Sequence, residues 1–415
     1  MTMAVYGLIG RTLGHSWSVP IHRELGCDGY KLIELEPEEL AGFFAEEDIG
    51  GLNVTIPYKL EVKRFCGSLA DSARRVGSVN TIVKDASGAL VGHNTDLCGL
   101  LYAMESAGIS MKGRKVLIFG SGGASLSAQA AADIQGAREA VVISRSGPDN
   151  YRNLSRHADA EILVNATPVG MYPRTGTMAA DPAFFQKCVG VVDMIYNPRR
   201  TAFLLRAEEL GIPCTDGLPM LVAQAAAAEE LFTGREGACG EIPRIVAMLR
   251  RQMMNIVLIG MPGCGKSSTG RELAALTGRP LVDIDEEIVK SQGRSIEEIF
   301  ASDGEAEFRR LEREHTAAAG RESGKILVTG GGVVKDFEGN YPSLHQNGRI
   351  CHLERDVLLL NREGRPLSRN ADLDAMYAER LPLYRKFRDA EVANTGPLRE
   401  VAEAVWRDFC ENIGD

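Results

Sequence analysis

The chain has 415 residues, of which 44% are hydrophobic and 25% are charged, and this length is enough for two or three domains that each bury a core. Its 47 lysines and arginines against 56 aspartates and glutamates give a net charge of −9, which excludes a general attraction to nucleic acid or to an anionic membrane. Nine cysteines without a C-x-x-C pair, no apolar run of ~20 residues and no signal-peptide pattern predict a cytoplasmic protein with reduced thiols.

Short apolar runs alternate with amphipathic stretches along the chain and end in Gly-rich turns, as in KVLIFGSGG (115–123) and NIVLIGMPG (255–263). Buried parallel strands in βαβ units give this pattern, so we expect an α/β fold throughout. The best candidate for a domain break is 233–255, where a Gly-rich turn, a short helical piece and a basic pair precede a new strand. The ~160 residues behind it have the size of one nucleotide-kinase-like domain.

Two candidates for proton transfer lie in the first hundred residues. The run NVTIPYK ends in Lys59, and GHNTD ends in Asp96. A Lys–Asp pair can exchange a proton with a carbonyl group while a hydride arrives from a nicotinamide. Spacing alone does not pair the two residues, and each by itself is also typical of a solvated surface side chain.

The run KVLIFGSGGASLSAQAAA predicts a strand, a Gly-rich turn and an Ala-rich helix. Its glycines match only the start of G-x-G-x-x-G, since Ser125 occupies the position of the third glycine. This partial match alone does not establish a dinucleotide-binding site. The next strand ends about 20 residues later at Arg145, where an NAD site usually has an acidic residue and where Arg suits the 2′-phosphate of NADP. We therefore predict NADP, with a solvated loop end as the alternative for Arg145.

The motifs GHSWS, NVTIPYK, GSVNT, GHNTD, GSGGAS, NATPVGM, DMIYNP and DGLPMLVAQA occur in the order seen in shikimate dehydrogenase, which residues 4–250 resemble. The resemblance implies NADPH-dependent reduction of 3-dehydroshikimate to shikimate, with Lys59 and Asp96 as the catalytic pair. It implies a discontinuous α/β substrate domain, 1–103 with 217–250, around a Rossmann NADP domain, 104–216. One departure is Asp149, in a region where the family often has a second basic residue.

The same resemblance implies two sets of binding residues. The substrate set consists of Ser16, Ser18, Thr55, Lys59, Asn80, Asp96, Tyr196 and Gln224. The NADP set consists of Gly120, Ser121, Gly122, Gly123, Ala124, Ser144, Arg145, Ser146, Thr167, Met194 and Gly217.

A second phosphate-binding motif begins at residue 260, where the sequence fits G-x-x-x-x-G-K-[ST] between a strand and a helix. Backbone N–H groups of such a loop surround the phosphates, and the helix N-terminus adds partial positive charge. Lys266 would reach the β- and γ-phosphates, and the Ser267 hydroxyl would ligate Mg²⁺. The predicted ATP site comprises Gly260, Met261, Pro262, Gly263, Cys264, Gly265, Lys266, Ser267 and Ser268.

Two carboxylates follow in PLVDIDEEI. We expect Asp283 and Asp285 to alternate on a strand end and therefore to point to the same side. Beside a P-loop, such a pair can serve Mg²⁺ and an acceptor hydroxyl; without that context, a solvated acidic turn is the better interpretation.

The P-loop, D-x-D, F-R, G-G-G, R-P-L and R-x-P-L-Y pieces resemble shikimate kinase over 254–415, and they imply a nucleoside-monophosphate-kinase-like α/β fold with a parallel sheet. The resemblance implies MgATP-dependent phosphorylation of the shikimate 3-hydroxyl, with metal contacts at Ser267 and Asp283. Asp285 would accept the hydroxyl proton, and Lys266 and Arg365 would act on the phosphates. Shikimate would be held by Asp285, Arg309, Gly330, Gly331, Gly332 and Arg380.

We therefore predict a bifunctional enzyme of aromatic amino acid biosynthesis that uses NADP(H), ATP and Mg²⁺. Its partners would be small molecules, with no nucleic acid and no membrane, and the sequence leaves monomer or homodimer open. Two alternatives remain. The first half could be a quinate/shikimate dehydrogenase that uses NAD, or one half could be a non-catalytic regulatory module.

Overall fold

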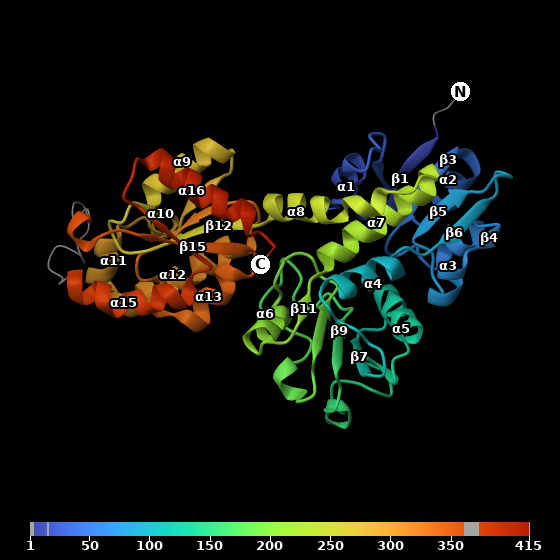
Figure 1. The fold of residues 1–415 in the computed structure, drawn as a ribbon, viewed down its shortest axis with the longest axis horizontal. Helices are drawn as coiled ribbons and strands as arrows, with labels where there is room; N and C mark the ends of the chain where they lie inside the picture. The colour runs from blue at the N-terminus through green and yellow to red at the C-terminus, as the bar shows by residue number, and fades with distance from the viewer. Residues whose placement is uncertain (1–3, 15, 361–372, 415) are drawn as a thin grey trace. The chain divides into compact units, whose positions relative to one another are not determined.

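The computed structural model describes residues 4–14, 16–360 and 373–414, and the chain divides into two compact units (Figure 1). Unit 1 consists of Met1–Met171, Thr177–Tyr196 and Phe203–Val246. Unit 2 consists of Tyr172–Gly176, Asn197–Ala202 and Ala247–Asp415. Both units contain parallel strands with helices between them, so the α/β class predicted from the sequence is confirmed. None of the helices among the described residues is long and apolar enough to span a membrane.

The first sheet of unit 1 has the strand order β2-β1-β3-β5-β6-β4. Its strands β1 and β3 are parallel and almost fully buried, which explains their apolar sequences; β5 runs antiparallel to β3 and β6. The strands are β1 (Val5–Gly10), β2 (Lys31–Glu34), β3 (Ile49–Val54), β4 (Ser68–Leu69), β5 (Thr81–Lys84) and β6 (Leu90–His93). The helices of this part are α1 (Ser18–Glu24), α2 (Leu40–Glu46) and α3 (Asp71–Val76), with the 3-10 helix η1 (Glu61–Phe65).

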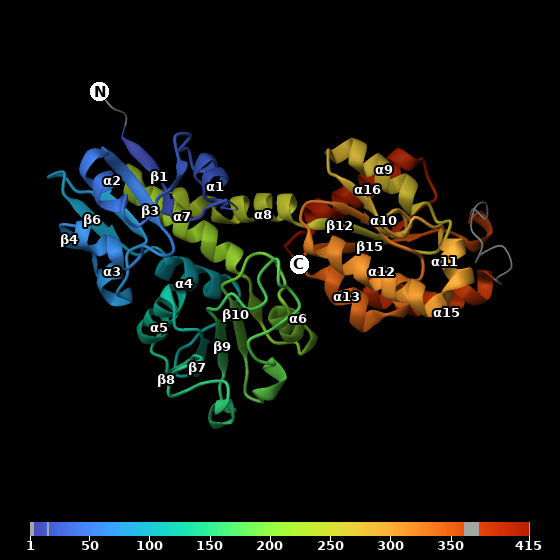
Figure 2. The same ribbon diagram turned by 180° about the vertical axis from the view of Figure 1, so that it is seen from behind.

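The second sheet of unit 1 is entirely parallel, with the order β11-β10-β9-β7-β8 (Figure 2). The helices α4 and α7 pack side by side between the two sheets (Figures 1 and 2). The strands are β7 (Lys115–Phe119), β8 (Glu139–Ile143), β9 (Ile162–Asn165), β10 (Gly190–Asp193) and β11 (Cys214–Thr215). The helices are α4 (Asp96–Ser106), α5 (Gly123–Gln135), α6 (Ala202–Glu209) and α7 (Gly217–Thr233), with η2 (Leu154–His157), η3 (Pro182–Phe184) and η4 (Ala238–Glu241).

The sheet of unit 2 is also parallel, with the order β13-β14-β12-β15-β16. Helices α9 and α16 cover one face, while α12, α13 and α15 cover the other (Figures 1 and 2). The strands are β12 (Asn255–Ile259), β13 (Leu281–Asp283), β14 (Ile326–Val328), β15 (Gly348–Glu354) and β16 (Ala390–Ala393). The helices are α9 (Lys266–Thr277), α10 (Ile284–Gln292), α11 (Ile296–Ser302), α12 (Gly304–Arg321), α13 (Phe337–His345), α15 (Leu373–Phe387) and α16 (Leu398–Glu411), with η5 (Val333–Lys335) and η6 (Val357–Leu359).

The stretch before β12, which the sequence predicts as a turn with a short helical piece, is largely a regular helix, α8 (Ile242–Met253). The chain passes from unit 1 to unit 2 within this helix. Its apolar side chains Ile242, Ile245 and Leu249 are buried and recur at helical spacing, which is why the segment is helical.

Candidate active sites

The cavity of unit 1 has a volume of about 460 Å³ and is lined by polar groups from both halves of the unit. The structure brings together in this cavity all eight predicted substrate residues: Ser16, Ser18, Thr55, Lys59, Asn80, Asp96, Tyr196 and Gln224. They come from the loops after β1, β3 and β10, from the residue directly before β5, and from α1, α4 and α7. Burial raises the pKa of Tyr196, so its phenol stays protonated and can donate a hydrogen bond.

Lys59 and Asp96 form an ion pair on the wall of this cavity. The Lys59 Nζ atom lies 2.6 Å from Oδ2 of Asp96, and the two side chains are only 20% and 12% exposed. Asn80 donates from Nδ2 to the other carboxylate oxygen of Asp96 at 2.9 Å. An ammonium group held by a fixed carboxylate can give a proton to a carbonyl oxygen and regain it. The structure therefore shows that Lys59 and Asp96 form a pair, which the sequence alone left open.

Two hydroxyl groups lie together where α1 begins. Ser16 Oγ donates to Ser18 Oγ at 3.0 Å and accepts from the Ser18 backbone N–H at 3.2 Å. Closely spaced hydroxyl donors of this kind suit a small anionic group such as a carboxylate. Sequence analysis did not assign Asn53, which also lines the cavity; strand alternation with Thr55 was the available signal.

The predicted NADP residues divide between this cavity and the neighbouring strand ends of the second sheet. Ala124, Met194 and Gly217 line the cavity. Thr167 lies on the loop after β9, where its hydroxyl donates to Asn165 Oδ1 at 2.6 Å. Among the described residues, the other predicted positions lie outside the lining of this cavity: Gly120, Ser121, Gly122, Gly123, Ser144, Arg145, Ser146 and Thr167.

The loop after β8 presents Arg145 to solvent in a closed turn. The Ser144 backbone N–H donates to the Asp149 carbonyl oxygen at 3.2 Å, and the Gly147 N–H donates to Ser144 Oγ at 2.9 Å. Asp149 lies in the region where the family often has a second basic residue. Its carboxylate lies 2.9 Å from Nε2 of His157. The Asp149 carboxylate is therefore paired with the imidazole of His157, which sequence analysis did not assign.

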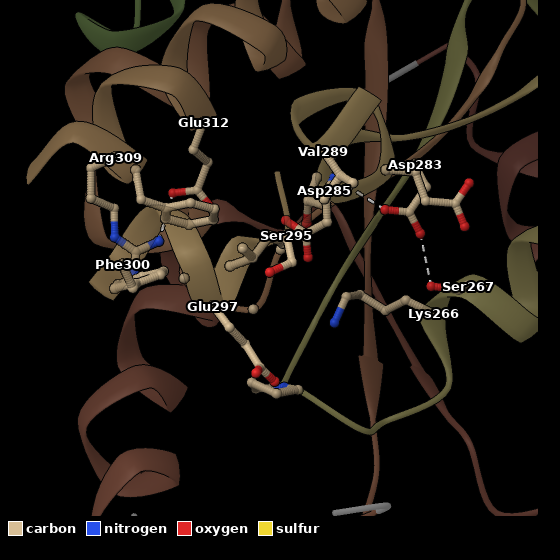
Figure 3. Close-up of a pocket in the computed structure, with 18 of the residues that line it drawn as sticks. Lys266, Ser267, Asp283, Asp285, Val289, Ser295, Glu297, Phe300, Arg309 and Glu312 are labelled. Carbon is tan, nitrogen blue, oxygen red and sulfur yellow. Dashed lines mark hydrogen bonds and ion pairs between the residues drawn. The ribbon is translucent and has the colours of Figure 1, made fainter. Parts of the chain in front are cut away.

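The cavity of unit 2 has a volume of about 630 Å³ and opens beside the P-loop (Figure 3). It is lined by predicted ATP, metal and substrate residues: Pro262, Lys266, Ser267, Asp283, Asp285, Arg309, Gly330, Gly331, Gly332 and Arg380. Among the described residues of the predicted ATP site, six belong to the P-loop or the start of α9 without lining this cavity: Gly260, Met261, Gly263, Cys264, Gly265 and Ser268. Arg365 lies outside the described residues.

The P-loop joins β12 to α9 as its motif predicts. Gly265 caps α9 with a φ of +97°, which is a left-handed conformation, and a Cβ atom there would lie 2.5 Å from Nδ2 of Asn394. Lys266 is buried, and its ammonium donates to the carbonyl oxygens of Gly260 at 2.9 Å and Met261 at 3.0 Å. Asn394, which sequence analysis missed, donates to the carbonyl oxygen of Cys264 and so connects the loop to the end of β16.

Asp283 and Asp285 both line the cavity, but the predicted strand alternation is wrong. The strand β13 ends at Asp283, and Asp285 lies in the first turn of α10. The reason is capping, because Asp283 Oδ1 accepts from the Asp285 backbone N–H at 3.1 Å and so begins the helix. The other oxygen, Oδ2, accepts from the Ser267 hydroxyl at 2.8 Å (Figure 3). A hydroxyl and a carboxylate are oxygen ligands of the kind that Mg²⁺ prefers.

Two arginines face the Gly-rich turn after β14. Arg309 Nη1 lies 2.7 Å from Oε2 of Glu312, whose pKa is raised by burial (Figure 3). Arg380 Nη1 donates to the Gly331 carbonyl oxygen at 3.0 Å. At Gly332 a Cβ atom would lie 2.4 Å from Arg309 Nη1, so only glycine lets this guanidinium come so close. Glu312 was not assigned from the sequence, although it lies one helical turn after Arg309.

Comparison with known proteins matches each unit to a family. Residues 8–82 match the shikimate dehydrogenase substrate binding domain, and residues 262–409 match shikimate kinase. Over 255 residues, the chain is 34% identical to the shikimate dehydrogenase (NADP(+)) of Clostridium perfringens (strain 13 / Type A), a match that covers 56% of this chain and 93% of that protein. The chain belongs to the shikimate dehydrogenase family. C-terminal to the dehydrogenase, the chain contains a shikimate kinase domain.

Solved structures share the fold of the dehydrogenase part. A chorismate mutase/shikimate 5-dehydrogenase fusion protein from Clostridium acetobutylicum gives a TM-score of 0.56 at 35% identity and covers 60% of this chain and 97% of that chain. A shikimate 5-dehydrogenase from Thermus thermophilus, in complex with NADP(H) and shikimate, gives a TM-score of 0.52 at 29% identity. This match covers 59% of this chain and 100% of that chain. The predicted bifunctional shikimate-pathway enzyme, with an NADP-dependent dehydrogenase and an ATP-dependent kinase, is confirmed.

Proposed function

We propose that the dehydrogenase reduces the carbonyl group of 3-dehydroshikimate with NADPH and that the kinase phosphorylates the 3-hydroxyl of the resulting shikimate. The observation that carries this proposal is that the side chains predicted for each substrate line one cavity in their own unit. The hydroxyl made by the first reaction is then the nucleophile of the second. A non-catalytic half gains no support, because both cavities keep their full set of described polar groups. An NAD-dependent quinate enzyme is disfavoured by the Ser18 hydroxyl in the cavity, which suits a shikimate-type carboxylate, and by Arg145, which suits the 2′-phosphate of NADP.

In the dehydrogenase, Lys59 would give a proton to the carbonyl oxygen as it becomes a hydroxyl, and Asp96 would hold the ammonium group in place. Ser16 and Ser18 would bind the substrate carboxylate through their paired hydroxyls. Thr55, Asn80, Tyr196 and Gln224 would position the ring and its hydroxyls. NADPH would supply the hydride from a site beside Ala124 and Met194. Arg145 would bind its 2′-phosphate.

In the kinase, the P-loop backbone and Lys266 would hold the phosphates of ATP. Ser267 and Asp283, which already share a hydrogen bond of 2.8 Å, would hold Mg²⁺, and that ion would neutralise phosphate charge. Asp285 would accept the proton of the shikimate 3-hydroxyl. The substrate carboxylate is assigned to Arg309 and Arg380, because a guanidinium can bind a carboxylate through two parallel hydrogen bonds.

The domain boundaries predicted from the sequence remain part of the proposal: 1–103 with 217–250, 104–216 and 254–415. A cytoplasmic location is supported by nine cysteines that are all free thiols. The net charge of −9 favours small-molecule partners over nucleic acid or a membrane, and either a monomer or a homodimer is compatible with the sites.

A coupled assay tests the proposed function. The purified chain is given 3-dehydroshikimate, NADPH and MgATP, and we expect oxidation of NADPH together with formation of shikimate 3-phosphate. Omission of ATP should leave shikimate as the product, and supply of shikimate with MgATP should bypass the need for NADPH. A chain that performs only one of the two steps would contradict the proposal.

A further inference from the structure

A buried histidine lies next to the cavity of unit 1, outside the predicted site. His22 is 0% exposed, and its two ring nitrogens each face a side-chain oxygen. Its Nδ1 lies 2.9 Å from Oε2 of Glu229, and its Nε2 lies 3.1 Å from Oδ1 of Asn53. The Tyr30 hydroxyl donates to the same Asn53 oxygen at 2.7 Å, and the Tyr30 ring stacks on the imidazole with centroids 3.8 Å apart.

The hydrogen-bond partners of Asn53 fix the orientation of its amide. Its Nδ2 faces the Asn80 carbonyl oxygen at 3.4 Å and Thr81 Oγ1 at 3.1 Å. A carbonyl oxygen can only accept, so the nitrogen of Asn53 must be on that side and its oxygen must face His22 and Tyr30. That oxygen also only accepts, and therefore Nε2 of His22 carries a proton.

The other ring nitrogen of His22 faces the Glu229 carboxyl group. If Glu229 is ionised, Nδ1 must donate and His22 is an imidazolium; if Glu229 is protonated, it donates to a neutral ring. In both cases the pair holds two protons and Nε2 remains a donor. Both side chains are buried, His22 at 0% and Glu229 at 4% exposure, so loss of the Glu229 carboxyl group would leave a buried ring nitrogen of His22 without this hydrogen bond.

The three residues connect three elements that carry parts of the predicted substrate site. His22 lies on α1, Asn53 at the end of β3 and Glu229 on α7. These same elements and the loop after β3 carry Ser18, Thr55 and Gln224. The Glu229–His22–Asn53 connection therefore fixes the relative positions of residues that face the substrate.

The hydrogen bonds continue from Asn53 to the catalytic pair. Asn53 Nδ2 donates to Thr81 Oγ1, which donates to Asn80 Oδ1 at 3.1 Å. Asn80 Nδ2 donates to Asp96 Oδ1 at 2.9 Å, and Asp96 holds Lys59. Asparagine amides do not pass protons along such a series of hydrogen bonds. The series therefore acts by fixing the orientation of the side chains that it connects.

We propose that His22, paired with Glu229, is a positioning residue of the dehydrogenase. It fixes the amide of Asn53 and, through that amide, the side chains that hold 3-dehydroshikimate against Lys59 and Asp96. The proposal rests on the proposed reduction of 3-dehydroshikimate. A chain that does not reduce this compound would overturn the proposed function, whereas the variants below test the His22–Glu229 pair.

A matched pair of variants at Glu229 tests the proposal in the full-length chain. Glu229→Gln keeps a donor and an acceptor beside Nδ1, and we expect kcat/KM within about 3-fold of that of the unaltered chain. Glu229→Leu removes the partner, and we expect the KM for 3-dehydroshikimate to rise about 10-fold or more while the KM for NADPH stays within about 2-fold. The kinase rate of the same preparation gives the amount of intact chain.

The KM values separate positioning from folding. A variant that only reduces the amount of folded dehydrogenase would lower the apparent kcat and leave both KM values unchanged, and this result would overturn the proposal. Tyr30→Phe is the control, because it removes the second donor to Asn53 but keeps His22. We expect it to change the KM for 3-dehydroshikimate less than Glu229→Leu does; an equal effect would assign the role to Tyr30 instead.

Discussion

The Nζ atom of Lys59 lies 2.6 Å from Oδ2 of Asp96, although the two residues are 37 positions apart in the chain. The sheet order makes this contact possible, because β3 and β6 flank β5 and each leads into one of the two residues. Asn80, at the start of β5, then holds the second oxygen of Asp96. Asn80 thus fixes the Asp96 carboxylate, and this carboxylate in turn orients the ammonium group of Lys59.

Lys59→Met should abolish most of the reduction without affecting the kinase. General acid–base groups contribute about 10²- to 10⁴-fold, so we expect kcat for 3-dehydroshikimate reduction to fall by that range. Asp96→Asn should also lower kcat, because an amide does not stabilise the ammonium group. The measurement is NADPH oxidation, with shikimate phosphorylation by the same preparation as the control. Loss of phosphorylation in either variant would contradict two independent sites.

Asp283→Asn and Asp285→Asn should separate metal binding from proton transfer in the kinase. Asp283 Oδ2 accepts a hydrogen bond from the Ser267 hydroxyl, so both oxygens lie where Mg²⁺ would bind, and neutralisation of Asp283 should raise the Mg²⁺ concentration needed for half-maximal activity. Asp285→Asn should lower kcat about 10²-fold or more with little change in that Mg²⁺ requirement. The experiment is a Mg²⁺ titration of shikimate phosphorylation. Equal Mg²⁺ dependence in both variants would contradict the assignment.

The parts of the sites that the sequence predicts correctly are those with a local signal. The P-loop is an example, because strand, glycines and helix start are contiguous in the chain. Alternation along a strand predicts that Asp283 and Asp285 lie on one strand, but Asp283 is also a good N-cap residue, and its capping of the Asp285 N–H begins the helix earlier. Asn394 and Glu312 were missed because a single polar residue has no periodicity and gains its neighbours only through the fold.

Arg145→Ala should reduce the preference for NADPH over NADH. Hydrogen bonds to charged groups contribute about 1.5–3 kcal/mol, so we expect kcat/KM for NADPH to fall roughly 10- to 150-fold and that for NADH to change little. Arg152→Ala, which removes another exposed arginine after β8, is the matched control. Asp149→Asn should raise the preference for NADPH a few-fold, since it removes a negative charge from the loop that presents Arg145. An unchanged NADPH/NADH ratio in Arg145→Ala would contradict the assigned role.

The stability of unit 2 should fall as the pH is lowered from 7 to 5, because of His352. This side chain is 1% exposed on β15, and burial, followed by the charge of Arg388, lowers its pKa from 6.5 to about 4. Between these values the unfolded chain binds a proton that the folded chain does not, so the free energy of unfolding decreases as the pH falls. The expected loss between pH 7 and pH 5 is about 2 kcal/mol.

Tryptophan fluorescence can measure this loss, because Trp17 and Trp406 are the only tryptophans in the sequence. In a Trp17→Phe background, Trp406 on α16 reports urea unfolding of unit 2 alone. His352→Gln removes the titrating group, and we expect the free energy of unfolding then to depend much less on pH between 7 and 5. An equally steep dependence in this variant would mean that other groups cause the acid sensitivity.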